Sequence, residues 1–120
     1  MKPSHHPLEH LFHATKWSLA GLKAAWMHEQ AFRIEVVASF VFIPLAFYLG
    51  ETHIEKVLLL LSWLLVMIIE LLNSAVEAAV DRISTDYHEL SGRAKDLGSA
   101  AVFLGNITFA TTWIILIFKP

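Results

Sequence analysis

Long apolar runs separated by short polar segments are the main pattern of the chain. Three stretches, about 31–50, 55–80 and 97–118, approach the roughly 20 residues that a helix needs to cross a bilayer. The last of them contains no charged residue. Pro44 interrupts the first, where a proline kink is tolerated in a membrane helix. The pattern predicts an all-α membrane protein with three transmembrane helices.

The segment before the first span, about residues 8–28, has a different pattern. Its apolar residues recur near helical spacing but are interrupted by Lys and His. This is typical of a helix that lies in the membrane interface with its apolar face in lipid. Trp17 and Trp26 suit the depth of the lipid headgroups. We therefore expect an N-terminal amphipathic surface helix, with a frayed polar tail as the alternative.

Composition supports a membrane protein and removes several other classes. Of 120 residues, 56% are hydrophobic and 17% charged, with a mean hydropathy of +0.56, which is too apolar for an ordinary soluble domain of this size. The length suits one domain, taken here as 1–120. The absence of cysteine excludes disulfides and Cys-ligated metals. A net charge of −2 without a basic run gives no reason to expect nucleic acid.

Lys and Arg are distributed unequally between the two ends of the predicted spans. One side carries only Lys56 and Lys119. The positive-inside rule therefore places the N-terminus and the 81–96 segment in the cytoplasm, and the C-terminus across the membrane. The residues on the basic side are Lys2, Lys16, Lys23, Arg33, Arg82, Arg93 and Lys95.

Acidic and amide residues appear where the longest apolar run ends, in IIELLNSAVE (68–77). At about 100° per residue, Glu70, Asn73, Glu77 and Asp81 fall on one narrow stripe of a helix. An ionisable side chain at membrane depth normally faces a protein interior or a water-filled cavity. A headgroup-level helix end is the alternative for Glu77 and Asp81. It suits Glu70 less well, because Glu70 lies roughly 10 Å deeper than Glu77.

The residue types of this region suit phosphoryl transfer. A carboxylate in a partly apolar site can act as a general base, and a second one nearer to water could hold Mg²⁺, which prefers oxygen ligands. Lys95 is a point charge suited to phosphate. Neither GxxxxGK[ST] nor GxGxxG is present. The residues alone thus indicate a membrane carboxylate site of unknown chemistry, and a proton- or ion-translocating protein that uses Glu70 is the alternative from another class.

The stretch ELLNSAVEAAVDRISTDYHELSGRAKDLGSAAV (70–102) resembles the signature of the prokaryotic diacylglycerol kinases of the Gram-negative type. GLKAAWMHEQAFRIE (21–35) is similar to the family's segment before the first span, and the likeness covers roughly residues 16–118. It implies a homotrimeric helical bundle in the cell inner membrane, with a periplasmic C-terminus. It also implies transfer of the γ-phosphoryl group of MgATP to the primary hydroxyl of diacylglycerol, giving phosphatidic acid. An undecaprenol kinase on the same scaffold is the alternative.

The resemblance also implies individual roles. Glu70 resembles the general base, with Asn73 beside it, and Glu29 and Glu77 resemble the pair that holds the divalent metal. His10 stands where many relatives have arginine and receives no role. The implied nucleotide contacts are Trp17 (a tyrosine in many relatives), Glu29, Glu77, Asp86, Tyr87, His88, Lys95 and Asp96. The implied lipid site comprises Lys23, Ala24, Ala25, Trp26, Glu35, Glu70 and Ser99.

Polar and small residues within the spans also favour association between copies of the chain. Three helices shield Glu70, Asn73 and Asn106 poorly from lipid, so we expect neighbouring subunits to supply the rest of the wall. The third span carries small residues that permit close helix approach, at Gly98, Ser99, Ala100, Ala101 and Gly105.

Overall fold

The computed structural model describes residues 6–118, which form four helices and no strand. These are α1 (Pro7–His28), α2 (Gln30–Leu49), α3 (His53–Ile83) and α4 (Glu89–Ile117). The prediction of an all-helical chain is confirmed. Lys2 and Lys119, which entered the charge comparison, lie outside the described residues.

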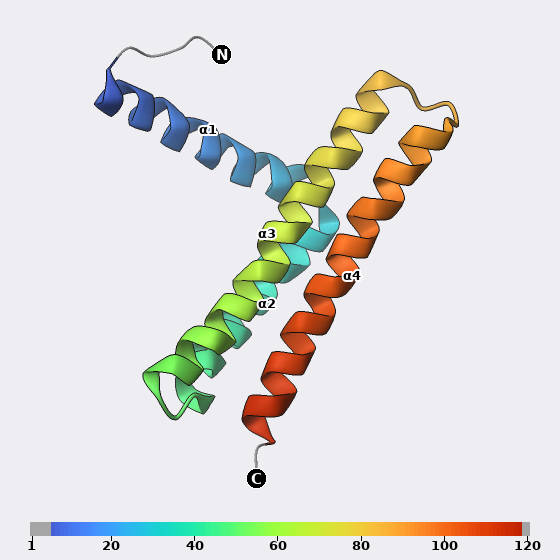
Figure 1. The fold of residues 1–120 in the computed structure, drawn as a ribbon. Coiled ribbons are helices and arrows are strands. Elements are labelled where there is room, and N and C mark those ends of the chain that lie inside the picture. The colour runs from blue at the N-terminus through green and yellow to red at the C-terminus, as the bar shows by residue number, and fades with distance from the viewer. Residues whose placement is uncertain (1–5, 119–120) are drawn as a thin grey trace.

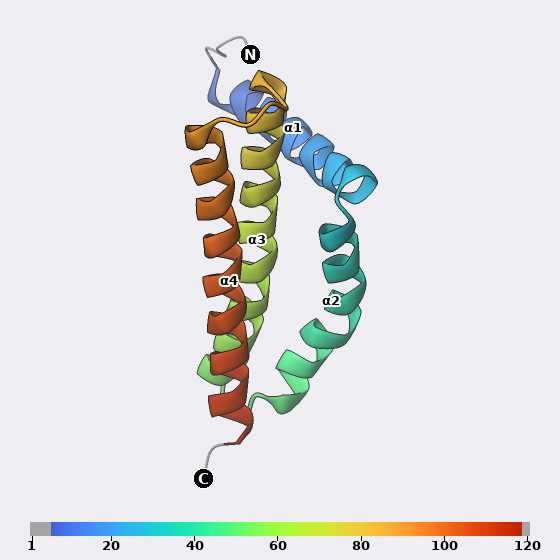
Figure 2. The same ribbon diagram turned by 90° about the vertical axis from the view of Figure 1, so that its right-hand side faces the viewer.

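Helices α3 and α4 lie side by side along most of their length, and α2 packs on α3 (Figures 1 and 2). α2 contains Pro44 and curves toward the other two helices near its C-terminal end (Figure 2). α1 projects away from the bundle at a steep angle and meets it near its own C-terminus (Figure 1). The result is an open arrangement in which each helix exposes a long face.

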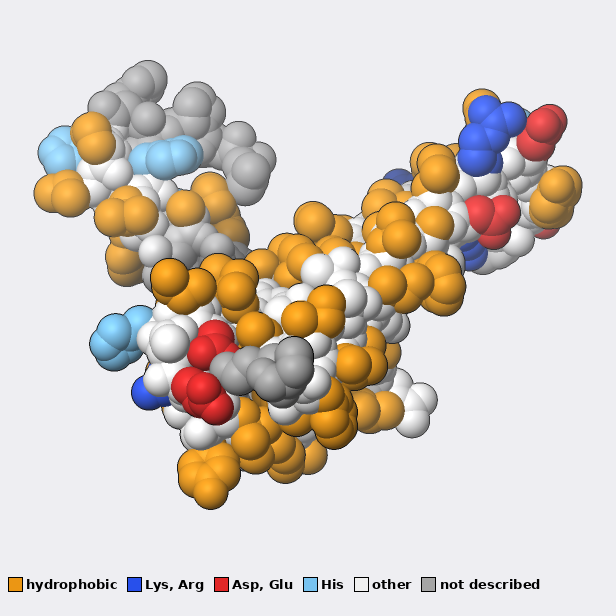
Figure 3. All heavy atoms as spheres, turned by 60° about the horizontal axis from the view of Figure 1, so that its bottom comes forward, with side chains coloured by type: hydrophobic (Ala, Val, Ile, Leu, Met, Phe, Trp, Pro, Cys, Tyr) orange, Lys and Arg blue, Asp and Glu red, His pale blue; other side chains and the backbone are white. Residues whose placement is uncertain are grey.

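Three helices, α2, α3 and α4, are long and apolar enough to cross a membrane. Apolar side chains cover most of the helix surface in Figure 3, and the charged side chains gather at the ends. Little of each span is buried within one chain. In the most apolar 18-residue stretch of each helix, only 11% to 22% of the residues are buried. The remaining apolar surface needs lipid or another protein surface as its surroundings.

The 81–96 segment is more helical than its polarity suggests. α3 continues to Ile83 and α4 begins at Glu89, so only residues 84–88 connect them. His88 caps α4, because its Nδ1 accepts a hydrogen bond from the Leu90 amide at 3.1 Å. Glu89 in the first turn complements the helix dipole. Arg93, one turn further, lies 3.6 Å from the Glu89 carboxylate.

An aromatic cluster joins α2, α3 and α4 in the half of the bundle that contains no carboxylate stripe. Trp113 is 7% exposed and packs against Phe42 and Phe109. Its Nε1 donates to the Leu59 carbonyl and to Ser62 Oγ, each at 3.1 Å. These bonds matter because lipid offers no alternative partner to a buried polar group. The cluster therefore provides a fixed base from which the site-bearing ends of the helices extend.

Candidate functional site

The carboxylates of the predicted stripe lie on α3. Two further carboxylates lie near them, Glu35 from α2 and Glu29 from the junction between α1 and α2. Glu29 and Glu77 both lie close enough to Glu70 for their charges to interact. Glu35 of α2 interacts with Glu70 in the same way, and its Oε1 is buried without a hydrogen-bond donor from the described residues. The structure thus brings Glu70, Glu77, Glu29 and Glu35 into one acidic neighbourhood.

Asn73 is the most buried polar member of the stripe, at 9% exposure. Its Nδ2 donates to Glu77 Oε1 at 3.2 Å, one helical turn along α3. Its Oδ1 is buried, and none of the described residues donates a conventional hydrogen bond to it. The resemblance placed Asn73 beside Glu70, whereas the Asn73 side chain donates its hydrogen bond to Glu77.

Glu29 is positioned by a break between two helices. Its backbone is extended, with φ −117° and ψ 104°, and it separates α1 from α2. Arg33 stabilises this break, because its Nη1 donates to the carbonyls of Trp26 and Met27 at 2.9 and 3.2 Å. A basic group on the last carbonyls of a helix also complements the helix dipole. Glu29 is therefore held at the corner where α1 meets the bundle.

A cleft of about 700 Å³ separates α1 from α3 beside this corner. Ala24 and Ala25, two members of the predicted lipid site, line this cleft together with Glu29. Lys23 and Trp26 are exposed and do not line it. The lining comprises Ser18, Gly21, Leu22, Ala24, Ala25, His28, Glu29, Leu71, Ser74, Ala75 and Ala78.

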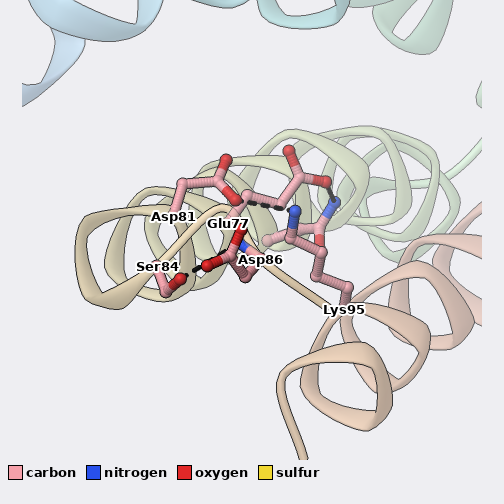
Figure 4. A network of polar contacts seen from close by, with 6 residues as sticks. Glu77, Asp81, Ser84, Asp86 and Lys95 are labelled. Atoms are coloured by element: carbon pink, nitrogen blue, oxygen red, sulfur yellow. Dashed lines mark hydrogen bonds and ion pairs between the residues drawn. The ribbon is translucent and has the colours of Figure 1, made fainter. Parts of the chain in front are cut away.

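Lys95 reaches from α4 to α3 at the polar end of the pair. Its Nζ lies 2.7 Å from Asp81 Oδ1, as Figure 4 shows. Lys95 precedes the apolar run that begins at Leu97. The hydrogen bond to Asp81, together with the charges of Asp81 and Glu77, raises the pKa of the Lys95 amine above its usual value. The lysine therefore keeps its positive charge next to the end of the acidic stripe.

The predicted loop contacts gather around a hollow of about 340 Å³ at the α3–α4 connection. Asp86, Tyr87 and His88 line it and are exposed. The Asp86 amide donates to Ser84 Oγ at 3.0 Å, which fixes the turn after α3 (Figure 4). Asp96 and Ser99 lie exposed on α4.

Trp17 lies on α1, where its ring stacks on His13 with centroids 5.7 Å apart. It is 40% exposed and lines none of the clefts described above. Its predicted contact with a nucleotide base stays a prediction.

The carboxylates of this site can bind a divalent cation only if further ligands come from outside one chain. Among the described residues, no three or more His, Asp or Glu side chains form a metal cluster. Glu29 and Glu77 supply two carboxylates near Glu70. Mg²⁺ characteristically uses one or two carboxylates and completes its shell with substrate phosphates and water. The pair therefore suits Mg²⁺ brought with a nucleotide better than a structural metal.

Three residues that shape this region were not among the predicted site residues. Asp81 pairs with Lys95, and its signal was its position on the stripe, one turn beyond Glu77. Arg33 stabilises the corner that carries Glu29. Gly98 of α4 faces the Asn73 amide, a contact between helices that one sequence does not reveal.

A sequence model of the family described as prokaryotic diacylglycerol kinase matches residues 16–117. The chain belongs to the prokaryotic diacylglycerol kinase family. It is 57% identical over 106 residues to a diacylglycerol kinase of Haemophilus influenzae, covering 88% of this chain and 90% of that protein. A diacylglycerol kinase of Escherichia coli K12 is 53% identical, with 88% and 87% covered. One from Pseudomonas aeruginosa is 46% identical over 110 residues, with 92% and 89% covered.

This family membership confirms the resemblance drawn from residues 70–102. The match begins at Lys16, within α1, and runs to the last residue of α4. The matched range therefore includes the α1–α3 cleft, the acidic stripe and the Lys95–Asp81 pair.

Proposed function

We propose that the chain is a diacylglycerol kinase, which transfers the γ-phosphoryl group of MgATP to the primary hydroxyl of diacylglycerol. Family membership supports the activity. The observation that carries the mechanism is the polar line along α3, from Glu70 through Glu77 to Asp81, where Lys95 of α4 pairs with Asp81. This line runs from the apolar part of α3 to its polar end, where a lipid hydroxyl and a water-soluble nucleotide can meet.

Glu70 is the general base of this proposal. Its carboxylate accepts the proton of the lipid hydroxyl, and the hydroxyl oxygen then bonds to the γ-phosphorus as the bond from that phosphorus to ADP breaks. The products are phosphatidic acid and ADP, and the proton remains on Glu70 until it passes to water. Three further carboxylates, those of Glu29, Glu35 and Glu77, lie close enough to Glu70 for their charges to interact with it.

Glu29 and Glu77 are the proposed ligands of Mg²⁺. When bound, the ion neutralises phosphate charge that would otherwise repel both the carboxylates and the incoming oxygen. Glu77 is oriented for this role by the hydrogen bond from Asn73. Glu29 is oriented by the helix break that Arg33 stabilises.

The nucleotide site in this proposal lies at the polar end of α3 and α4. Lys95 contributes a fixed positive charge for a phosphate, and it can exchange Asp81 for that partner because both side chains are partly exposed. Exposed donors and acceptors of the adjacent loop and helices contact the rest of ATP. They are Trp17, Asp86, Tyr87, His88 and Asp96.

The lipid site lies where α1 meets the spans. We propose that α1 is an amphipathic surface helix, so that the α1–α3 cleft opens at headgroup depth. Glu35, with a buried oxygen that lacks a donor among the described residues, can accept a hydrogen bond from a lipid hydroxyl. The remaining proposed contacts are Lys23, Ala24, Ala25, Trp26, Glu70 and Ser99.

We also propose that residues 1–120 form one domain that assembles as a homotrimer in the cell inner membrane. The small share of each span buried within one chain supports association. The unequal distribution of Lys and Arg supports a cytoplasmic N-terminus and 84–88 loop, and a periplasmic C-terminus.

The activity is tested by incubating purified protein in mixed micelles with MgATP and one lipid alcohol at a time. We expect phosphatidic acid from diacylglycerol, and no ATP consumption without an acceptor. Preferential phosphorylation of undecaprenol would replace the proposed acceptor and retain the kinase. ATP-independent proton flux through reconstituted vesicles, without lipid phosphorylation, would overturn the proposal in favour of translocation.

A further inference from the structure

Gly98 of α4 lies directly against the side chain of Asn73 on α3. A Cβ atom at position 98 would overlap Asn73 Oδ1 and would stand 3.2 Å from Asn73 Cγ. In glycine, a hydrogen atom occupies the direction of this missing Cβ. The Gly98 Cα–H bond therefore points at Asn73 Oδ1, in the arrangement of a weak Cα–H···O hydrogen bond.

The two ends of the Asn73 amide face partners of opposite kinds. On one side, the Gly98 Cα–H can only donate, and the buried Oδ1 accepts no conventional hydrogen bond from the described residues. On the other side, the Glu77 carboxylate can only accept, and it lies 3.2 Å from Nδ2. A flipped amide would present its oxygen to a carboxylate oxygen. The surroundings thus select one orientation of the amide.

We propose that Gly98 is a positioning residue for the cation-binding carboxylate Glu77 and acts through Asn73. By leaving room for Oδ1, it seats the amide so that Nδ2 holds Glu77 Oε1 in place. Hydrogen bonds that orient a metal-binding carboxylate influence metal affinity strongly. The inference rests on the proposed function, because that proposal makes Glu77 a ligand of the divalent cation.

Gly105 provides a matched control on the same face of α4. It lies two turns beyond Gly98 and also packs against α3. A Cβ there would come 2.8 Å from Ile69 Cδ1, the far end of a flexible side chain. Gly105→Ala therefore perturbs helix packing in the same pair without touching the Asn73–Glu77 hydrogen bond.

The test is a Mn²⁺ titration followed by electron paramagnetic resonance, with a non-hydrolysable ATP analogue and the full-length protein in detergent. We expect Gly98→Ala to raise the dissociation constant of Mn²⁺ by about tenfold or more, in the range seen when outer-shell partners are removed. Gly105→Ala should leave that constant unchanged. Thermal unfolding of both variants separates a loss of fold from a loss of cation binding. Equal Mn²⁺ affinity in the two variants would overturn the inference.

A double-mutant cycle keeps the inference testable if Gly98→Ala does not fold. Asn73→Ala removes both the amide and the overlap, so Gly98→Ala should cost no further Mn²⁺ affinity in the Asn73→Ala background. A further loss in the double variant would show that Gly98 does not act through Asn73. The proposed function fails separately, if the wild-type protein phosphorylates no lipid alcohol in the micelle assay.

Discussion

Lys95 and Asp81 join α4 to α3 through an ion pair in which Nζ lies 2.7 Å from Oδ1. Asp81 stands one helical turn beyond Glu77, and the charge of Glu77 also acts on the lysine. The side chains of Lys95 and Asp81 are 44% and 52% exposed, so solvent screens the pair and it adds little to stability. Its effect is to hold a positive charge beside the acidic stripe.

Lys95→Met should weaken the use of ATP without unfolding the protein. Loss of a charged hydrogen-bond donor to phosphate should raise the KM for ATP by about tenfold to a hundredfold. Arg93→Met is the matched control, because the ion pair of Arg93 is with Glu89 of its own helix, at 3.6 Å. Steady-state kinetics at saturating lipid measure both variants. Equal KM values for ATP in the two variants would remove Lys95 from the nucleotide site.

Ser39→Ala should destabilise the junction of α2 and α3. Trp63 Nε1 donates to Ser39 Oγ at 2.9 Å, and the substitution leaves that partly buried N–H without its acceptor. The expected loss is about 1–3 kcal/mol in the free energy of unfolding. Ser18→Ala is the control, since Ser18 donates to Ala14 O within the exposed helix α1. Unfolding by detergent titration compares them, and equal stability would show that the bond is dispensable.

The orientation of the chain can be tested with single cysteines, because the sequence contains none. Thr85→Cys places a thiol in the 84–88 loop, and Glu51→Cys places one in the turn between α2 and α3. A membrane-impermeant maleimide added outside spheroplasts should label position 51 and spare position 85. Labelling of position 85 alone would reverse the orientation inferred from Lys and Arg.

The helices were predictable because apolar length and periodicity depend on the local sequence. Glu70, Asn73 and Glu77 were predictable as a group for the same reason, since helical geometry alone places them on one stripe. The extension of α3 and α4 into the 81–96 segment was less visible. At the start of α4, the His88 cap favours a helix that begins in the polar segment, before the apolar run.

Contacts between helices could not be predicted in this way. Nothing in one sequence shows that Lys95 meets Asp81, or that Gly98 faces Asn73, because both contacts depend on how α4 is rotated and shifted against α3. Likewise, Glu29 has the sequence pattern of a solvated helix end. The break that places it near Glu70 depends on Arg33, four residues further along the chain.

The most direct test of the central claim, that Glu70 deprotonates the lipid hydroxyl, is the turnover number of Glu70→Gln in the diacylglycerol assay. Glutamine keeps the shape of the side chain and cannot accept the proton, so kcat should fall by about a hundredfold to ten-thousandfold. Affinity for the ATP analogue should be retained. Glu55→Gln, at the opposite end of α3, is the matched control and should retain wild-type turnover. A kcat for Glu70→Gln equal to that of Glu55→Gln would contradict the claim.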